Sequence, residues 1–386
     1  MIDFLVKHPR LGRLFDLLLP LLAVLAALGV GAVMLQLLGA NPFQAYSAMV
    51  RGAFGSQNAL ADTIVRATPL LLVGLGICIA FRGGVINIGG EGQLIIGALF
   101  ATALGLWFPE APVLILVPAA MVAGFLGGAI WGGIPGVLKA YYNVNEILST
   151  IMLNIIAVQA MNYLLRGPMI DPVQLEAASR IPQTARLAAA FDLPRLVPTR
   201  LHAGALLAVV LAFVVYILLW RTTIGYRIRA VGLNRDASRY AGINVNRNIV
   251  LALLLSGAFA GLAGAVQVYG LHHRMFTDGS AAGFTGSAGF NGIVAALFGR
   301  LHPLGTIPAS FIFGALIVGA NSLQRAMQVP AALVTALNGL VVIFVVSSEI
   351  FSRRLARQRQ IKVEPSSSSP PPEPVTIIPS GSEVIE

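Results

Sequence analysis

The chain has 386 residues, of which 56% are hydrophobic and only 11% are charged, whereas roughly a quarter of the residues in an ordinary soluble domain are charged. So few charges exclude a soluble protein of this length, because they could not cover its surface. The formal net charge of +10 does not indicate nucleic-acid binding, since no basic stripe interleaved with aromatic residues occurs. Arginines that anchor cytoplasmic loops explain the charge instead.

The apolar residues fall in blocks of about 20, the length that an α-helix needs to cross a hydrocarbon core of about 30 Å. The sequence therefore predicts an all-α integral membrane protein. Nine blocks are clear, and each predicts a spanning helix: 15–38, 64–81, 85–108, 112–137, 147–165, 202–220, 249–270, 304–323 and 331–350. The first block is too long for the apolar part of a signal peptide and lacks a convincing cleavage site, so we expect it to be retained.

Arginine and lysine predict the orientation of these spans, because both concentrate in cytoplasmic loops. They place the N-terminus, the segment 221–248 and the start of the tail in the cytoplasm, through Lys7, Arg10, Arg13, Arg221, Arg227, Arg229, Arg235, Arg239, Arg247, Arg353, Arg354, Arg357 and Arg359. An odd number of spans, such as nine, cannot leave both the N-terminus and the tail in the cytoplasm. A tenth crossing is therefore needed, and the glycine-rich stretch 285–299 is the one available. The loop 166–201 then lies outside despite its five arginines, which goes against the same rule.

We therefore expect about ten transmembrane helices, some of them short or interrupted by glycine, with both termini in the cytoplasm. The expected organisation is a cytoplasmic segment 1–14, a transmembrane domain 15–350 and a tail 351–386. The tail begins with basic residues and continues in a Ser/Pro-rich stretch, which predicts disorder.

Polar residues interrupt the apolar sequence between the second and third spans. The segment 81–93 reads FRGGVINIGGEGQ and contains Asn87, Glu91 and Gln93 among five glycines. Polar side chains and irregular backbone at membrane depth are tolerated only where protein or water satisfies them. Two interpretations stay open: a broken helix that lines a solute path, or a glycine-rich turn at the water interface.

Two further places carry polar residues next to apolar sequence. The segment 283–292 is again glycine-rich and contains Asn291, and a pair of such segments is typical of a transport site. The span that begins near residue 147 carries Glu146, Thr150 and Asn154 at intervals of four, so they share one helix face. That face either lines a path or forms hydrogen bonds between helices.

The cytoplasmic segment 221–248 contains the signals of a short helix at about 235–241. Asn234 suits the N-cap, Asp236 the first turn and Gly242 the position after the C-cap. Such a helix could rest on lipid headgroups or dock into a groove on a cytoplasmic partner. Its residues are Arg235, Asp236, Ala237, Ser238, Arg239, Tyr240 and Ala241, followed by Gly242.

Several catalytic sites are excluded. The lysines (Lys7, Lys139 and Lys362) do not follow a glycine, so the chain has no phosphate-binding loop of the Gly-Lys-Ser/Thr type and cannot bind ATP in that way. The five histidines form no His-Glu-x-x-His motif, and Cys78 is the single cysteine, so neither a zinc site nor a disulfide is supported. We expect no enzymatic activity and no metal or cofactor bound by this chain.

Three stretches in the same order resemble the permease subunits of ATP-binding cassette (ABC) importers. They are FRGGVINIGGEGQ at 81–93, NEILSTIMLNIIA at 145–157, and VGLNRDASRYAGINVNR with LSGAFAGLAGA at 231–265. The resemblance runs from about residue 60 to 350 and favours the branched-chain amino acid and ribose permease superfamily, of nucleoside or simple-sugar type. Gly90 stands where that family often has a larger residue, a mild departure.

The resemblance implies a transport subunit in the bacterial plasma membrane, whose partners are two ABC ATPase domains that use the ATP, a second permease (often a different chain) and an extracytoplasmic solute-binding protein. It implies that the helix at 235–241 is the coupling helix that docks into the ATPase. The polar residues of the first half and Asn291 become candidates for the translocation path. Rival hypotheses are a proton-coupled transporter, for which Glu91 and Glu146 are the available carboxylates, a permease for branched-chain amino acids, and a non-transport membrane protein.

Overall fold

The computed structural model of the chain describes residues 9–348, except 38, 178–179, 329, 331–335, 337–338, 341–342 and 345–346, with side chains from residue 22 onward. Most of the expected span 331–350, and the whole of the expected tail 351–386, therefore lie outside the described residues, as do residues 1–8.

The described residues form helices and no strands; two isolated β-bridges join Gln183 to Phe276 and Arg195 to His202. The helices are α2 (Pro9–Leu37), α3 (Pro42–Phe54), α4 (Gln57–Arg82), α5 (Gly90–Trp107), α6 (Val113–Tyr142), α7 (Glu146–Arg166), α8 (Pro172–Glu176), the 3-10 turn η1 (Ala189–Phe191), α9 (Gly204–Arg221), α10 (Thr223–Leu233), α11 (Arg235–Tyr240), α12 (Val245–Gln267), the π-helical turn η2 (Val268–His272), α13 (Ala281–Thr285), α14 (Ala288–Phe298) and α15 (Pro303–Met327).

Seven described helices are long and apolar enough to cross a membrane: α4, α5, α6, α7, α9, α12 with η2, and α15. The expectation of an all-helical membrane protein is therefore confirmed. Two shorter apolar helices accompany them, Leu22–Leu37 within α2 and the eleven-residue α14. A helix of eleven residues is about 16 Å long, roughly half of the hydrocarbon thickness, so α14 alone does not make the tenth crossing expected at 285–299.

The chain nevertheless runs between the two ends of the bundle through a broken segment that contains α13 and α14. Near its start, Gln267 Nε2 donates to Phe284 O and Thr285 O, at the end of α12 that adjoins η2. Just after α14, Leu301 O accepts a hydrogen bond of 3.2 Å from Nε of Arg82, the last residue of α4. This contact lies at the other end of the bundle from Gln267. The break falls at Gly286 and Ser287, which both have positive φ.

Helix α12 lies at the centre of the bundle and packs against α4, α5 and α6. Its contact with α6 is unusually close because both helices present glycines every four residues: Gly124, Gly128 and Gly132 on α6, and Gly257 and Gly261 on α12. A Cβ at Gly128 would overlap the carbonyl oxygen of Gly257. Small residues that let backbones approach are the usual basis of helix association in a membrane.

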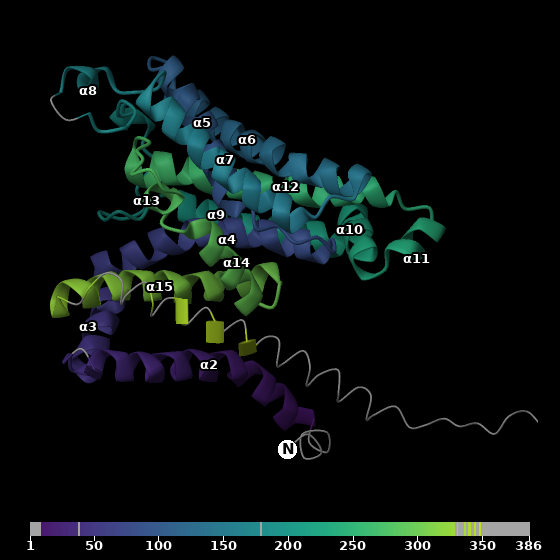
Figure 1. Cartoon of the computed structure of the whole chain (residues 1–386), viewed down its shortest axis with the longest axis horizontal. Coiled ribbons are helices and arrows are strands. Elements are labelled where there is room, and N and C mark those ends of the chain that lie inside the picture. The colour runs from purple at the N-terminus through teal and green to yellow at the C-terminus, as the bar shows by residue number, and fades with distance from the viewer. Residues whose placement is uncertain are drawn as a thin grey trace, which may run out of the picture.

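Several shorter helices were not predicted, among them α8, α3 and α10. α3 follows α2 and packs on α15, and its N-cap Asn41 accepts hydrogen bonds from Phe43 N and Gln44 N. α10 precedes α11 within the segment 221–248, where only one short helix was expected. Figure 1 shows α10 and α11 together at one end of the bundle and α8 at the opposite end; these are called the α11 end and the α8 end below.

Candidate functional site

Five buried polar side chains gather at the start of α5, where they hydrogen-bond to one another or to the backbone of residues 88–92. We call them the buried amide cluster: Asn87, Gln93, Thr150, Asn154 and Ser256. Asn87 stands at its centre, in the turn between α4 and α5. Its Nδ2 donates to Gln93 Oε1 at 2.9 Å and to Ser256 Oγ of α12 at 2.8 Å. Its Oδ1 accepts from Gly89 N at 2.9 Å and from Gln93 Nε2 at 3.1 Å. The side-chain amide of Asn87 is thus fully used within the protein.

Helix α7 joins the cluster from the other side. Asn154 Oδ1 accepts from Gly92 N at 2.8 Å, and Asn154 Nδ2 donates to Ile88 O at 2.9 Å. Thr150 Oγ1 lies 3.4 Å from Ile88 N and donates to Glu146 O at 2.7 Å. These bonds fix the irregular backbone of residues 87–89 and satisfy Gly92 N, which has no partner within α5 because it lies in the first turn. The cluster therefore ties the turn to α5, α7 and α12.

Glu146, expected on the same face, does not join the cluster. It is the first residue of α7, and its Oε2 lies 2.9 Å from Lys139 Nζ near the end of α6. Its side chain is 13% exposed. The backbone carbonyl of Glu146 accepts from Thr150, but its side-chain carboxylate points away from the cluster and pairs with a lysine.

The two glycine-rich segments contact each other where α5 and α14 begin. Glu91 is 1% exposed, and its Oε1 accepts from Phe290 N at 3.2 Å. Gly289 lies so close that an added Cβ would overlap Glu91 N, and Asn291 follows, half-buried on α14. Glu91 Oε2 is buried and has no hydrogen-bond partner among the described residues. This places a carboxylate of the first segment at the break in the second.

Helix α11 projects at its end of the bundle and begins as predicted. The side chain of Asn234 accepts from Asp236 N and Ala237 N, both at 3.0 Å, and Gly242 has the expected positive φ. The helix runs from Arg235 to Tyr240, one residue shorter than predicted. Tyr240 is 94% exposed, an unusual exposure for a large aromatic side chain.

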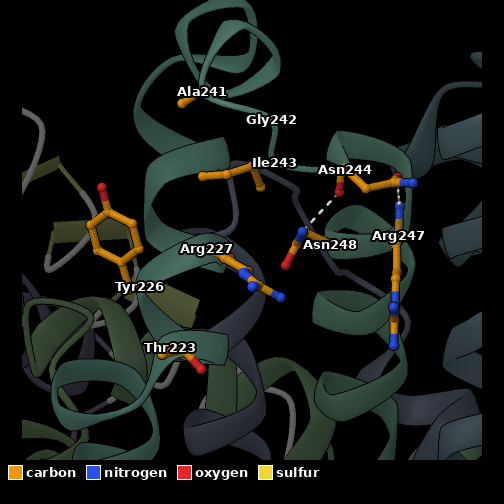
Figure 2. A pocket seen from close by; sticks show the side chains of 9 residues that line it. All are labelled: Thr223, Tyr226, Arg227, Ala241, Gly242, Ile243, Asn244, Arg247 and Asn248. Carbon is orange, nitrogen blue, oxygen red and sulfur yellow. Dashed lines mark hydrogen bonds between the residues drawn. The ribbon is translucent and has the colours of Figure 1, made fainter.

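The rest of α11 shows one buried side and one charged side. Ser238 is buried, whereas Arg239 is exposed and lies 3.8 Å from Asp236 on the same helix. Ala237 and Ala241 are exposed. An open groove of about 450 Å³ lies beside the helix, lined by residues of α10, of the turn 241–244 and of α12. Figure 2 shows Arg227 and Arg247 in this groove, with Asn248 donating to Asn244 O.

A direct connection joins α11 to the segment 81–93. Arg235 Nη2 donates to Gly84 O at 3.1 Å. Just before it, Gly232 of α10 packs on the backbone of Arg82, and any Cβ there would overlap the Arg82 carbonyl oxygen. Gly84 itself has φ +69°, a left-handed conformation that favours glycine. A displacement of α11 would therefore act on the turn that carries the buried amide cluster.

Sequence reasoning did not identify Ser256, Gly232 or the role of Arg235 toward Gly84. Ser256 bonds to Asn87 across 169 positions, and no local pattern indicates such a pair. Among the described residues, no group of three or more His, Cys, Asp or Glu side chains could hold a metal ion.

Comparison with known proteins decides what kind of protein carries this arrangement. The family described as "Branched-chain amino acid transport system / permease component" matches residues 59–346, which run from the first turn of α4 to beyond the end of α15. The chain belongs to this permease family. It is therefore a multi-pass membrane transport subunit, and the polar groups described above lie within the matched region.

Three relatives are similar over most of their length. The guanosine ABC transporter permease NupP of Bacillus subtilis is 37% identical over 336 residues, which cover 87% of this chain and 94% of the relative. The glucose ABC transporter permease TsgB13 of Haloferax volcanii is 37% identical over 345 residues, 86% of this chain and 88% of the relative. The nucleoside ABC transporter permease NupB of Lactococcus lactis is 29% identical over 354 residues, 89% and 94%. No solved structure shows a significant match to the permease.

Proposed function

We propose that this permease forms the membrane path of an ABC importer for a nucleoside or a simple sugar. The observation that carries the proposal is α11: an exposed helix joined through Arg235 to the polar turn between α4 and α5. The relatives named above, which transport guanosine, glucose and nucleosides, support the class of solute. The expected partners are two separate ATPase domains, a second permease of different sequence and an extracytoplasmic solute-binding protein.

In this proposal the α11 end faces the cytoplasm and both chain termini lie on that side. Six arginines in the segment 221–248 support this orientation, because arginine concentrates in cytoplasmic loops. Ten crossings then follow if α2, the broken segment around α13 and α14, and the apolar block 331–350 each cross once. The segment 1–14 and the tail 351–386 would both be cytoplasmic.

Residues 235–242 act as the coupling helix in this scheme. ATP binding draws the two ATPase domains together and moves α11 with them. The Arg235–Gly84 hydrogen bond and the Gly232–Arg82 contact pass the movement to residues 85–92. The buried amide cluster then carries it to α7 and α12 as a rigid unit, which changes the side of the membrane to which the path is open.

The residues proposed for the path divide into two roles. Glu91 and Asn291 lie where the two glycine-rich segments touch, and one carboxylate oxygen of Glu91 is unpaired there. They are the better candidates for lining the path. Asn87, Gln93, Thr150 and Asn154 hold its wall: Asn87 and Gln93 bond to each other, and Thr150 and Asn154 bond to the backbone of residues 88–92. Glu146 with Lys139 braces α6 against α7 near the α11 end.

A proton-coupled mechanism is less well supported. It would use several carboxylates at membrane depth, and the two available differ in setting: Glu146 is paired with Lys139, which leaves Glu91 alone. The chain belongs to a permease family, and the three relatives named above are ABC transporter permeases, which also favours coupling to ATP.

The proposal is tested by placing a charge on the exposed face of α11. Tyr240→Asp and Ala237→Asp should leave the fold intact, because both side chains are exposed, and should abolish ATP-driven uptake and weaken co-purification of the ATPase. Tyr142→Asp is the matched control, since Tyr142 is also exposed (74%) but lies at the end of α6. Wild-type uptake by the Tyr240 variant would refute the coupling role.

A further inference from the structure

A cavity of about 300 Å³ lies in the half of the bundle near the α8 end, apart from the buried amide cluster. It is enclosed by α4, the end of α12, the broken segment around α13 and α14, and α15. Its polar lining is Arg66, Gln267, Thr285 and Asn321, and its apolar lining includes Pro69 and Ile317. Its volume is at the lower limit of the range for small-molecule sites. In the proposed orientation it lies in the outer half of the bundle, on the side where a binding protein would deliver solute.

Arg66 is the positively charged residue in the lining of this cavity. It lies on the third turn of α4 and is half-buried; it forms no hydrogen bond or close ion pair with a residue that the structure describes, and the nearest carboxylate that attracts it is Asp62, one turn earlier on α4. Its Nη1 is 3.6 Å from the place where a Cβ on Gly286 would stand, so the guanidinium reaches the break between α13 and α14. The donors of its guanidinium are thus not used by hydrogen bonds within the described protein, and a ligand or water in the cavity can use them.

Gln267 contributes a hydrogen-bond acceptor, its side-chain oxygen Oε1, to the lining. It is 4% exposed, and its Nε2 donates to Phe284 O at 3.4 Å and to Thr285 O at 3.3 Å. Those two bonds orient the amide, so Oε1 cannot exchange places with the nitrogen. Oε1 is buried and has no hydrogen-bond donor among the described residues. A buried acceptor left unpaired is destabilising, which indicates that a donor from outside the chain completes it.

We infer that this cavity binds the base of a 6-oxopurine nucleoside, such as guanosine or inosine. The inference rests on the proposed function and names its solute more closely. The edge of such a base presents two neighbouring acceptors, N7 and O6, followed by the N1–H donor. Arginine pairs with N7 and O6 through its planar fork, and Gln267 Oε1 would accept from N1–H. Adenine presents an amino group between two acceptors, so its edge offers no adjacent pair of acceptors for the fork.

Arg66→Lys tests the inference, because lysine keeps the charge and removes the fork. The complex with its ATPase, second permease and binding protein is reconstituted in vesicles, and the binding protein is saturated with guanosine or adenosine, so that a change in preference comes from the permease. The variant should lose about tenfold of the preference for guanosine over adenosine while adenosine uptake and ATPase association stay unchanged. Arg325→Lys is the matched control, one turn beyond Asn321 on α15 and outside the lining.

An unchanged ratio of guanosine to adenosine uptake in Arg66→Lys would overturn the inference. So would a wild-type preference for glucose over nucleosides, although the proposed function would survive that result. Should the variant fail to assemble, 7-deazaguanosine, which lacks the N7 acceptor, decides on the wild-type complex: uptake about tenfold below guanosine supports the inference, and equal uptake overturns it. Wild-type vesicles that transport neither class with ATP would instead refute the proposed function.

Discussion

At Asn87 a single side chain satisfies four polar groups and is itself saturated. An unpaired polar group inside a protein costs about 1–3 kcal/mol, so a saturated amide at this depth stabilises the turn between α4 and α5. Glu91, four residues later, differs because one of its carboxylate oxygens is unpaired. The same sequence motif therefore contains one side chain whose hydrogen bonds are all made and one that keeps a buried carboxylate oxygen without a close partner.

This contrast predicts different effects for two substitutions. Asn87→Leu leaves Gln93 and Ser256 without partners and should destabilise the protein by about 1–3 kcal/mol for each group left unpaired. Glu91→Gln keeps an acceptor for Phe290 N and should preserve stability while it lowers uptake. Thermal unfolding in detergent can be followed by thiol labelling of the buried Cys78. Equal unfolding temperatures for Asn87→Leu and wild type would contradict the structural role.

His202 predicts a dependence of stability on pH. Its side chain is 2% exposed, its Nδ1 accepts from Gly204 N, and burial, with a smaller effect of His273, lowers the pKa of His202 from 6.5 to about 4. The unfolded chain binds a proton below pH 6.5 and the native protein only below about 4, so stability falls as the pH drops through that window. The full loss is about 3 kcal/mol.

The measurement is the unfolding temperature at pH 7.5 and pH 5 for wild type and for His202→Asn, which keeps an acceptor for Gly204 N. The variant should lose less stability on acidification than wild type. Equal losses would show that the acid sensitivity comes from other groups, such as His273 or His302, whose pKa values are also lowered by burial.

Among the elements, α11 was predicted almost to the residue, because its signals are local: a capping asparagine, an acidic first turn and a glycine at the end. The long apolar helices were also predicted from their composition, but their ends were less exact: 64–81 was expected where α4 runs from Gln57 to Arg82. α3 and α10 were missed because they are short and carry too many polar residues to appear as apolar blocks. The contacts between α10, α11 and the turn after α4 could not be predicted, since Arg235 and Gly84 are 151 positions apart.

The link between α11 and that turn can be tested without disturbing either element. Arg235→Ala removes the hydrogen bond to Gly84 O and leaves the Asn234 cap intact. We expect the ATPase to bind and to hydrolyse ATP, but with much less uptake for each ATP consumed. Arg239→Ala is the control, since Arg239 is exposed and contacts only Asp236 among the described acidic residues. Equal uptake per ATP in both variants would exclude Arg235 as the connection.

For the whole molecule, the sequence predicted the class of protein and most of the spans but left the roles of the polar residues open. Asn87, Gln93, Thr150 and Asn154 were grouped with Glu91 and Asn291 as candidates for the path, and nothing in their spacing separates a residue that supports a wall from one that faces a solute. In the structure, the first four side chains are hydrogen-bonded within the protein, whereas Glu91 keeps an unpaired carboxylate oxygen; this difference supports the two roles proposed above. Arg66 and Gln267 were not singled out at all, because they lie 201 positions apart within apolar helices.

The central claim is that α11 lies in the cytoplasm and is covered by a separate ATPase. Tyr240→Cys, treated with a membrane-impermeant maleimide, tests it directly, since the one native cysteine, Cys78, is buried. We expect labelling in inside-out vesicles stripped of the ATPase, protection when the ATPase is added back, and no labelling of right-side-out vesicles. Labelling from the outside, or labelling that the ATPase does not reduce, would contradict it.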